Sequence, residues 1–303
     1  MRPKRHIAIV GAGKVGTAVG VLLSRAGYEI AALSSLRQAH ADAAAALIGG
    51  RALLDPVEAA RLGDVIFITT PDDALADVCV EIADGGGFSP EDAVFHMSGA
   101  VATDVLEPAR RAGARVGSIH PMQSFADAHG AIDQLPGSVF GVTAEPEALP
   151  VALEMIEALG GTPAHVSDEQ KALYHAAACI VSNYTVALAD AAEELYAAIG
   201  VDAHLARRAY GPLLAGTQSN LVRRGPTNAL TGPIARGDVS TVRRHLEALI
   251  AAGIDTSLYR ILGARTVAIA RRRDSLSQQK ADELLALLEN EGPRKHGHRG
   301  GGA

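Results

Sequence analysis

The sequence predicts an α/β protein in which a doubly wound, mainly parallel sheet is followed by an all-helical part. Short β-branched apolar runs alternate with helical patterns as far as residue 166, as a sheet of parallel strands with crossover helices requires. A glycine-rich turn directly follows the first apolar run. Beyond residue 166, helical periodicity continues and no strand pattern alternates with it.

Composition bounds the class of protein. A chain of 303 residues, 48% hydrophobic and 20% charged, is long enough for two globular domains. Its formal net charge of −6 argues against nucleic-acid binding. No continuous apolar run reaches the length of a membrane span, and no signal-peptide pattern is present, so we expect a cytoplasmic protein without membrane contact. The two cysteines, Cys79 and Cys179, lack metal-ligand spacing and read as buried thiols, so no metal site is expected.

The first strand and its glycine turn organise the chain. Residues 7–10 are a short β-branched run, typical of a strand buried on both faces. The following glycines have the spacing G-x-G-x-x-G, and a helix begins inside the run. In such a turn the first glycine permits the tight bend, the second lets a pyrophosphate approach the backbone, and the third lets helix and strand pack closely. The helix N-terminus favours a bound phosphate. The predicted dinucleotide-binding residues are Gly11, Gly13, Lys14, Val15 and Gly16. The alternative is a turn that binds nothing.

The end of the second strand, residues 29–33, indicates which dinucleotide binds. A site for NAD usually places an acidic residue there, on the ribose 2′-hydroxyl. This chain instead has Ser34, Ser35 and Arg37. Two hydroxyls and a guanidinium suit a 2′-phosphate, so the sequence favours NADP (NADPH). The alternative is that Arg37 is a solvated loop cation.

Three further strands, at 64–70, 93–97 and 115–119, end in polar residues. The carboxyl ends of parallel strands form the ligand-binding edge of such sheets. The residues expected there are Thr69, Thr70 and Pro71 toward the cofactor, Ser98 and His120 as catalytic groups, and Gln123 toward the substrate. Ser98 would orient the imidazole of His120, which would deliver a proton because histidine titrates near neutral pH. The alternative is a structural hydrogen bond at His120.

Asp72 or Asp73 is expected to cap the helix that follows at 74–83.

Shorter patterns complete the sheet domain. Strands are expected at 51–53, 139–143 and 164–166, and helices at 41–47, 74–83, 101–112 and 149–159. The predicted dinucleotide-binding domain is therefore 1–166.

A helical domain is predicted over 167–290, and a flexible basic tail over 291–303. One helix should run over 168–199, capped by Ser167 or Asp168 and ended by Gly200. His175 and Asn183 interrupt its apolar pattern and are candidates to hold substrate or the nicotinamide amide, with a helix-to-helix contact as the alternative for Asn183. Further helices are expected at 204–215, 241–252, 257–272 and 278–288. In the loop 228–238, Arg236 is a candidate to bind a substrate carboxylate, or to pair with Asp238 or a dimer partner.

These motifs resemble the superfamily of 6-phosphogluconate dehydrogenase-like reductases, which join an N-terminal dinucleotide domain to a helical C-terminal domain. Pyrroline-5-carboxylate reductase, ketopantoate reductase and prephenate dehydrogenase belong to it. The chain is most similar to a branch of Rossmann-like proteins with a C-terminal domain of unknown function, over nearly its whole length. The matching segments are Thr70-Pro71-Asp72-Asp73, His120-Pro121-Met122-Gln123, Ser182-Asn183-Tyr184 and residues 229–238.

The resemblance implies site residues at some positions and not at others. In prephenate dehydrogenase a serine after one strand orients a histidine in a His-Pro motif after the next, as Ser98 and His120-Pro121 are placed here. The arginine-rich substrate signature of that enzyme is not evident. Ketopantoate reductase and the hydroxyacid dehydrogenases use a lysine four residues before an asparagine. Here Cys179 stands four residues before Asn183, and Lys171 lies twelve before it.

The sequence thus predicts an NADP(H)-dependent oxidoreductase acting on a small carbonyl or imine, keto-acid-like or ketopantoate-like, bound between the two domains. One rival interpretation is a non-catalytic NADP-binding redox sensor or partner-binding protein, and another is a scaffold that has lost its cofactor. Apolar faces on the helical domain predict a homodimer.

Overall fold

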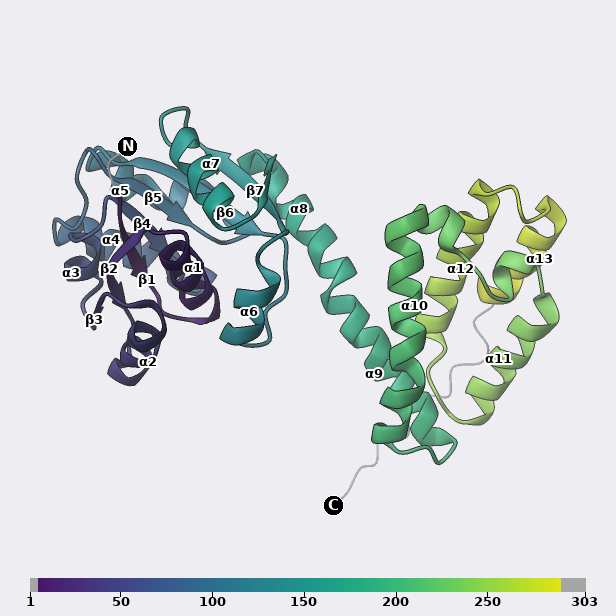
Figure 1. Cartoon of the computed structure of the whole chain (residues 1–303). Coiled ribbons are helices and arrows are strands. Elements are labelled where there is room, and N and C mark those ends of the chain that lie inside the picture. The colour runs from purple at the N-terminus through teal and green to yellow at the C-terminus, as the bar shows by residue number, and fades with distance from the viewer. Residues whose placement is uncertain (1–4, 290–303) are drawn as a thin grey trace, which may run out of the picture. The chain divides into compact units, whose positions relative to one another are not determined.

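The structure is a computed structural model that describes residues 5–289. The predicted tail over 291–303 lies outside this range. The described part of the chain forms two compact units that divide between residues 186 and 187 (Figure 1). The first unit contains the whole sheet, and the second is helical. This confirms the predicted fold class.

The sheet has eight strands in the order β3-β2-β1-β4-β5-β6-β7-β8. All neighbouring strands are parallel except β6 and β7, which are antiparallel. The strand order reverses direction beside β1, so the edge between β1 and β4 is the switch point where sheets of this kind bind ligands. The bounds are β1 (His6–Val10), β2 (Glu29–Ser34), β3 (Arg51–Leu53), β4 (Val65–Ile68), β5 (Ala93–His96), β6 (Arg115–Pro121), β7 (Val139–Ala144) and β8 (Thr162–His165).

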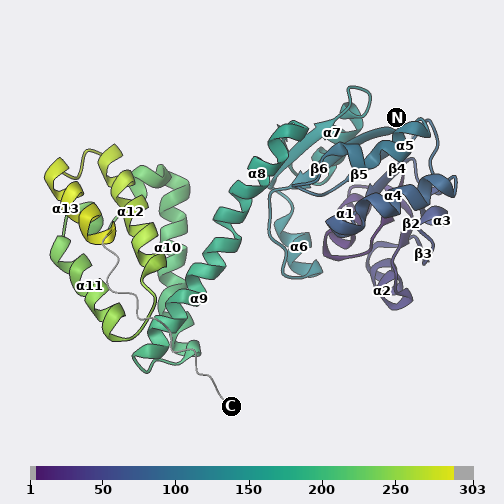
Figure 2. The same cartoon turned by 180° about the vertical axis from the view of Figure 1, so that it is seen from behind.

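Helices cover both faces of the sheet, as the buried side chains of β1 show. Ile7 and Ile9 pack in one apolar cluster, whereas Ala8 and Val10 pack in another on the opposite face. The first cluster includes residues of α1 (Lys14–Arg25), α2 (Gln38–Ile48), α6 (Ala128–Gln134) and α7 (Leu149–Ala158). The second includes residues of α3 (Pro56–Ala60), α4 (Leu75–Asp84) and α5 (Glu107–Arg111). The two layers can be followed in Figure 1 and, from behind, in Figure 2.

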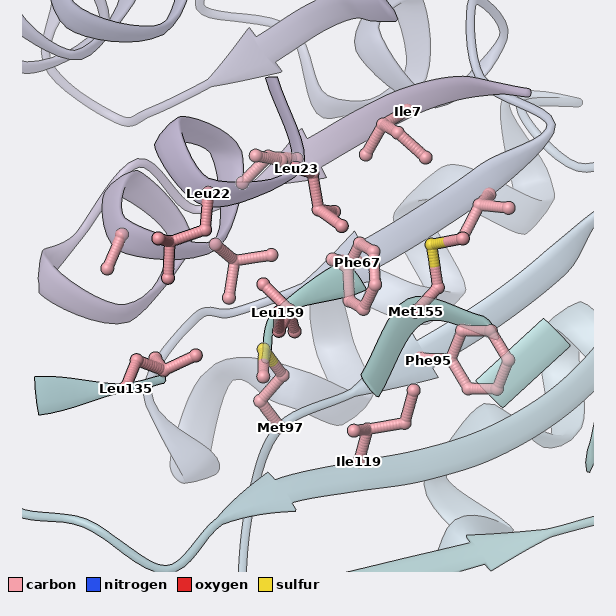
Figure 3. Close-up of a cluster of buried hydrophobic side chains, with 14 of the residues drawn as sticks. Ile7, Leu22, Leu23, Phe67, Phe95, Met97, Ile119, Leu135, Met155 and Leu159 are labelled. Atoms are coloured by element: carbon pink, nitrogen blue, oxygen red, sulfur yellow. The ribbon is translucent and has the colours of Figure 1, made fainter. Parts of the chain in front are cut away.

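Large side chains fill the first cluster (Figure 3). The rings of Phe67 on β4 and Phe95 on β5 lie 6.0 Å apart between centroids, in a tilted arrangement. Met155 of α7 is also fully buried in this cluster. The central strands are thereby held rigidly beneath the polar residues at their carboxyl ends.

The second unit has its own core. It comprises most of α9 (Asn183–Ala198) together with α10 (Ala203–Ala229), α11 (Val239–Ala251), α12 (Ser257–Arg272) and α13 (Gln278–Glu289). Val242, Val267 and Leu284 are almost fully buried in its apolar cluster. α10 is kinked at Gly225, whose φ of 69° interrupts the helix before Pro226.

The long helix over 168–199 is predicted as one element, but the structure has two. α8 (Asp168–Val181) ends at Ser182, whose φ of −97° and ψ of −70° depart from helical geometry, and α9 then begins at Asn183. The predicted start is confirmed, because Ser167 forms a capping box with Gln170. α8 belongs to the sheet unit, so the two compact units divide twenty residues beyond the boundary predicted at 166.

Two shorter predictions are wrong. Neither Asp72 nor Asp73 caps α4, because these residues form a short 3₁₀ turn, η1 (Asp72–Ala74), and Ala74 occupies the cap position. The helix expected over 101–112 is divided into η2 (Thr103–Leu106) and α5. α3 and α6, each of seven residues or fewer, were not predicted.

One stretch of the described chain is apolar enough to cross a membrane by length and composition alone. It lies within Asp168–Ala198, where an 18-residue window has a mean hydropathy of 1.3. The sequence was expected to contain no such stretch, and that expectation was wrong because the average over this window stays high although polar residues interrupt the apolar run. Its first turns belong to the sheet unit, since Lys171 is 2% exposed there.

Candidate active site

The turn between β1 and α1 has the geometry that its glycines predict. Gly11 has a φ of +104°, and a Cβ there would lie 2.8 Å from the amide nitrogen of Thr70. A Cβ on Gly16 would lie 2.4 Å from the carbonyl oxygen of Gly11. Gly13 differs, because a Cβ there would meet nothing within 4 Å. The first and third glycines therefore close the turn, while the second faces open space.

The N-terminus of α1 is suited to an anion. Gly13 is its N-cap, no side chain caps it, and its first turn contains no acidic residue. The first amides of a helix have no partner within the helix, so those of Lys14, Val15 and Gly16 are available to a phosphate. An open glycine beside uncapped amides fits the pyrophosphate of a dinucleotide, which would be held here by residues 11–16.

The end of β2 lies against this turn. The carbonyl oxygen of Ser34 accepts hydrogen bonds from the amides of Gly11 and Ala12, at 3.0 and 2.9 Å. The side chain of Ser34 is nearly buried, at 2% exposure, whereas Ser35 is half-buried and Arg37 is exposed. Ser34 therefore fixes the turn through its backbone, and Ser35 and Arg37 are the two side chains with access to a ligand.

The end of β4 joins the turn from the other side. The hydroxyl of Thr69 donates a hydrogen bond of 2.6 Å to the carbonyl oxygen of Gly11. The hydroxyl of Thr70 is buried and has no hydrogen-bond partner in the part of the chain that the structure describes, which is uncommon for a buried polar atom. Pro71 follows and is exposed. The orphaned hydroxyl next to an uncapped helix is a second feature that fits a bound polar group.

A second group of polar residues lies at the ends of β5 and β6, and we call it the strand-end cluster. It consists of Ser98, Ser118, His120, Lys171, Tyr174 and His175. Lys171 of α8 is its most buried charge, at 2% exposure. Its ammonium group donates hydrogen bonds to the hydroxyl of Ser118, at 2.7 Å, and to the carbonyl oxygen of Ser98, at 3.1 Å. α8 is also anchored by Asp168, which accepts hydrogen bonds from the amide and hydroxyl of Thr103.

His120 is held by two residues of α8. Its Nδ1 lies 3.2 Å from the hydroxyl of Tyr174. The ring of His175 stands nearly perpendicular to that of His120, with centroids 5.7 Å apart. Both rings approach Gly99, where a Cβ would lie 2.7 Å from Nε2 of His120 and from Nδ1 of His175. The Nδ1 atom of His175 is buried and has no hydrogen-bond partner among residues 5–289. Only glycine at position 99 lets the two imidazoles come this close.

The expected hydrogen bond between Ser98 and His120 is not formed. The hydroxyl of Ser98 instead donates to Oδ2 of Asp72, at 2.8 Å, and accepts from the amides of Ala100 and Val101. These three contacts use its proton and both lone pairs. Tyr174 is thus the residue that contacts Nδ1 of His120, and Ser98 shapes the loop after β5.

Burial shifts the titration of this cluster. It lowers the pKa of His120 to about 4, and the neighbouring His175 and Lys171 act in the same direction. The expectation that His120 titrates near neutral pH is therefore wrong. Burial lowers the pKa of Lys171 to about 8, against the opposing pull of Asp168 and Asp72. At neutral pH the cluster holds a neutral imidazole beside a buried cation.

His96, at the end of β5, lies beneath the cluster. It is 0% exposed, and its Nδ1 accepts a hydrogen bond from the amide of Ser98. Its Nε2 has no hydrogen-bond partner among the described residues. Burial lowers its pKa to about 3, and Lys171 contributes in the same direction. His96 therefore supports the loop after β5 as a neutral ring.

Two predicted residues of the sheet unit lie outside the strand-end cluster, and a third belongs to the second unit. Gln123 is exposed, and its amide group donates to the carbonyl oxygen of Gln134 at 3.3 Å. Asn183 is exposed and eight residues beyond His175, about 12 Å along a helical path. Arg236 belongs to the second unit and is exposed there. Its suggested pairing with Asp238 is not formed, because Asp238 accepts from Ser240 and Thr241 as the cap of α11.

Lys171, Tyr174 and Asp72 were missed as site residues. The spacing of Lys171, Tyr174 and His175, at i, i+3 and i+4, places all three on one face of a helix. The capping box at Ser167 fixes where that helix begins, directly after the last strand. Together these signals point the face toward the sheet. Lys171 stands twelve residues before Asn183 and therefore does not match the lysine–asparagine spacing of the resembling families.

Comparisons with known proteins agree with this architecture. A model of a Rossmann-like domain matches residues 1–121, and a model of a domain of unknown function, DUF2520, matches residues 138–266. No curated protein matches the chain.

Solved structures share the fold over most of the chain. A Bacteroides fragilis protein described as an NADP oxidoreductase is 22% identical, with a TM-score of 0.71 over 89% of this chain and 99% of its own. Protein TM1727 from Thermotoga maritima is 25% identical, with a TM-score of 0.69 over 88% and 99%. An imine reductase from Pseudomonas sp. is 17% identical, with a TM-score of 0.59 over 90% and 100%. A pyrroline-5-carboxylate reductase from Coxiella burnetii has a similar fold. The chain thus joins a Rossmann-like N-terminal domain to a C-terminal domain of the DUF2520 family.

Proposed function

We propose that the protein is an NADP(H)-dependent oxidoreductase that reduces, or forms by oxidation, a small carbonyl or imine compound. The observation that carries this proposal is the turn of residues 11–16, with its open Gly13 and uncapped helix, at the switch point of the sheet. The strand-end cluster on the same carboxyl edge supplies polar groups for a substrate. Solved structures of this fold include reductases named for NADP, imines and pyrroline-5-carboxylate, which agrees with the proposal.

Residues at the end of β2 support NADP over NAD. Arg37 is exposed, with Ser35 two residues before it, and the β2 end contains no carboxylate. A guanidinium can make two parallel hydrogen bonds to a phosphate, and serine adds a further donor. These groups would contact the 2′-phosphate of the adenosine.

The chemistry at the strand-end cluster follows from its charges. A bound nicotinamide would supply or accept the hydride. His120, whose ring is neutral at neutral pH, would donate a hydrogen bond to the substrate oxygen or nitrogen, and the proton that accompanies the hydride would be exchanged with solvent water. The buried ammonium group of Lys171 would stabilise negative charge that develops on that atom. His175 would bind the substrate beside His120, and Gln123, Asn183 and Arg236 would take part only if the substrate reaches them.

A turnover assay with the variant His120→Ala tests this function. Purified protein is mixed with NADPH and a panel of keto acids and cyclic imines, and the loss of reduced nicotinamide is followed. We expect turnover with at least one substrate, and we expect His120→Ala to bind NADPH normally while turnover falls by about 100-fold or more. NADPH binding without turnover on any substrate would favour a redox sensor, and absence of saturable binding would favour a scaffold without cofactor.

We also propose a homodimer, because the helices expose many apolar side chains. Val181 and Val186 are 75% and 69% exposed, and in the second unit Leu213 and Val222 are 69% and 81% exposed. Exposed apolar patches of this kind mark protein or membrane contacts. A second copy of the chain would cover them without requiring a lipid partner.

A further inference from the structure

The contact between Tyr174 and His120 can set where the proton of a neutral imidazole resides, because the tyrosine hydroxyl is able to donate to the imidazole. Nδ1 of His120 lies 3.2 Å from the tyrosine hydroxyl, whereas the carbonyl oxygen of His120 lies 3.4 Å from the same hydroxyl. His120 also pairs with Gly141 across the antiparallel β6–β7 ladder. The imidazole nitrogen is therefore the nearer acceptor, and a phenol that donates to it leaves the ring proton on Nε2.

The groups around His120 favour its neutral form. Lys171, Tyr174 and His175 face it from α8, and His96 lies on the neighbouring strand β5. Lys171 is positively charged at neutral pH, and its ammonium group is fixed between Ser98 and Ser118. A fixed positive charge in a poorly hydrated site opposes a second positive charge on the ring.

The remaining ring nitrogen of His120, Nε2, lies next to Gly99. Nε2 of His120 would lie 2.7 Å from a Cβ on Gly99, as would Nδ1 of His175. Neither atom has a hydrogen bond within the described chain that would divert it from a ligand. Both nitrogens therefore converge over the one residue that has no side chain.

We propose that Tyr174 and Lys171 are positioning residues that hold His120 as a neutral ring protonated on Nε2, so that it presents a hydrogen-bond donor to the substrate. This inference rests on the proposed function for its purpose, but not for its test. A donor requires a lone pair on its partner. The site would accordingly accept a ketone, an aldehyde or a neutral imine, whereas a protonated iminium nitrogen offers no lone pair to His120.

The test is histidine nitrogen NMR on the full-length protein without cofactor. The ¹⁵N shifts of the two ring nitrogens distinguish both neutral tautomers from the imidazolium, and His120→Gln assigns the signals. We expect wild-type His120 to be neutral and protonated on Nε2 at neutral pH. A ring protonated on Nδ1, or an imidazolium, would overturn the proposal without any variant being made. Because no substrate or cofactor is present, this result is independent of whether the protein is an oxidoreductase.

The chain provides a matched control for Tyr174→Phe. In the second unit Tyr259 lies 2.8 Å from Nδ1 of His245, with rings in the same edge-to-face arrangement. Tyr174→Phe should increase the Nδ1-protonated population of His120 and leave His245 unchanged. Tyr259→Phe should do the reverse. A His120 spectrum that is the same in wild type and Tyr174→Phe would contradict the role of Tyr174.

Lys171→Met tests the second positioning residue. Methionine is of similar length and uncharged, so the pH at which His120 titrates should rise by about half a unit or more. Lys171→Arg, if it folds, keeps the charge and should keep the wild-type midpoint. A midpoint that is unchanged in a folded Lys171→Met protein would overturn the role of Lys171, and the wild-type and Tyr174→Phe spectra still decide the tautomer if that variant does not fold.

Discussion

The ammonium group of Lys171 lies 2.7 Å from the hydroxyl of Ser118, and the two residues are 53 positions apart in the sequence. This contact joins the first turn of α8 to the end of β6, beside His120. It places a buried cation where the neighbouring strands β5 and β6 end. The strand-end cluster is therefore built by α8 as much as by the sheet.

Removing the guanidinium of Arg37 should change which dinucleotide binds best. We expect Arg37→Ala to weaken NADPH binding by about tenfold, because one charge-assisted contact to the 2′-phosphate is lost. NADH binding should change little, since NADH lacks this phosphate. Calorimetric titration of both dinucleotides measures the difference. Arg25→Ala, at the opposite end of α1, is the control and should bind both as wild type does. Equal weakening for the two dinucleotides would contradict the assignment.

Lys171 should make the stability of the protein rise with pH in the alkaline range. Its pKa is about 8 in the folded protein against an ordinary value of 10.5. The unfolded chain thus binds more protons between these values, so the free energy of unfolding increases as pH rises through this window, on the order of 3 kcal/mol at most. Denaturant unfolding of wild type and Lys171→Met, at each pH, isolates the effect. If the difference between the two proteins does not vary with pH, Lys171 titrates normally.

His96 should make the protein sensitive to acid. Its pKa falls from the ordinary 6.5 to about 3 on folding. As the pH falls below 6.5, His96 takes up a proton in the unfolded chain but not yet in the folded protein, so the free energy of unfolding decreases. Asp92 acts in the opposite direction, because burial raises its pKa to about 6. The measurement is therefore the stability of wild type relative to His96→Gln, which should decline with acidification, while His129→Gln at an exposed position should follow wild type. A difference that is constant with pH would refute the buried neutral ring.

The proposed homodimer predicts a doubled mass in solution. Light scattering at micromolar concentration should give twice the chain mass, and Val222→Glu should shift the protein toward monomer because a carboxylate in an apolar interface is poorly solvated. Ala268→Glu, at an exposed position on α12, serves as control. A monomer that binds lipid vesicles would instead indicate that a membrane covers these helices. A monomer that does not bind vesicles would contradict the proposed dimer.

The sequence was sufficient for the sheet and for the glycine turn, because both depend on local patterns. Ile7 to Val10 could only be a buried strand, and the three glycines impose their own backbone geometry. The short helices α3 and α6 escaped notice because five to seven residues carry little periodicity. The break of the long helix at Ser182 was also not predicted, because no proline or glycine occurs near it in the sequence.

The strand-end cluster was harder to predict, because it depends on contacts between distant residues. Ser98 was expected to contact His120 since both end neighbouring strands, but local amides and Asp72 satisfy its hydroxyl. Likewise, the sequence does not indicate how deeply His120, at the end of a strand, is buried. Burial lowers the pKa of His120 to about 4, whereas the sequence alone predicts a value near neutral.

Calorimetric titration with NADPH of wild type and Gly13→Leu tests the central claim most directly. Gly13 has a φ of −83° and open space beside it, so leucine should leave the fold intact while occupying the path of the pyrophosphate. Gly16→Ala, which would press on the carbonyl of Gly11, should instead reduce stability. The account predicts saturable NADPH binding by wild type and a loss of about 100-fold or more in a folded Gly13→Leu protein. Absence of binding by wild type, or equal binding by both proteins, would contradict it.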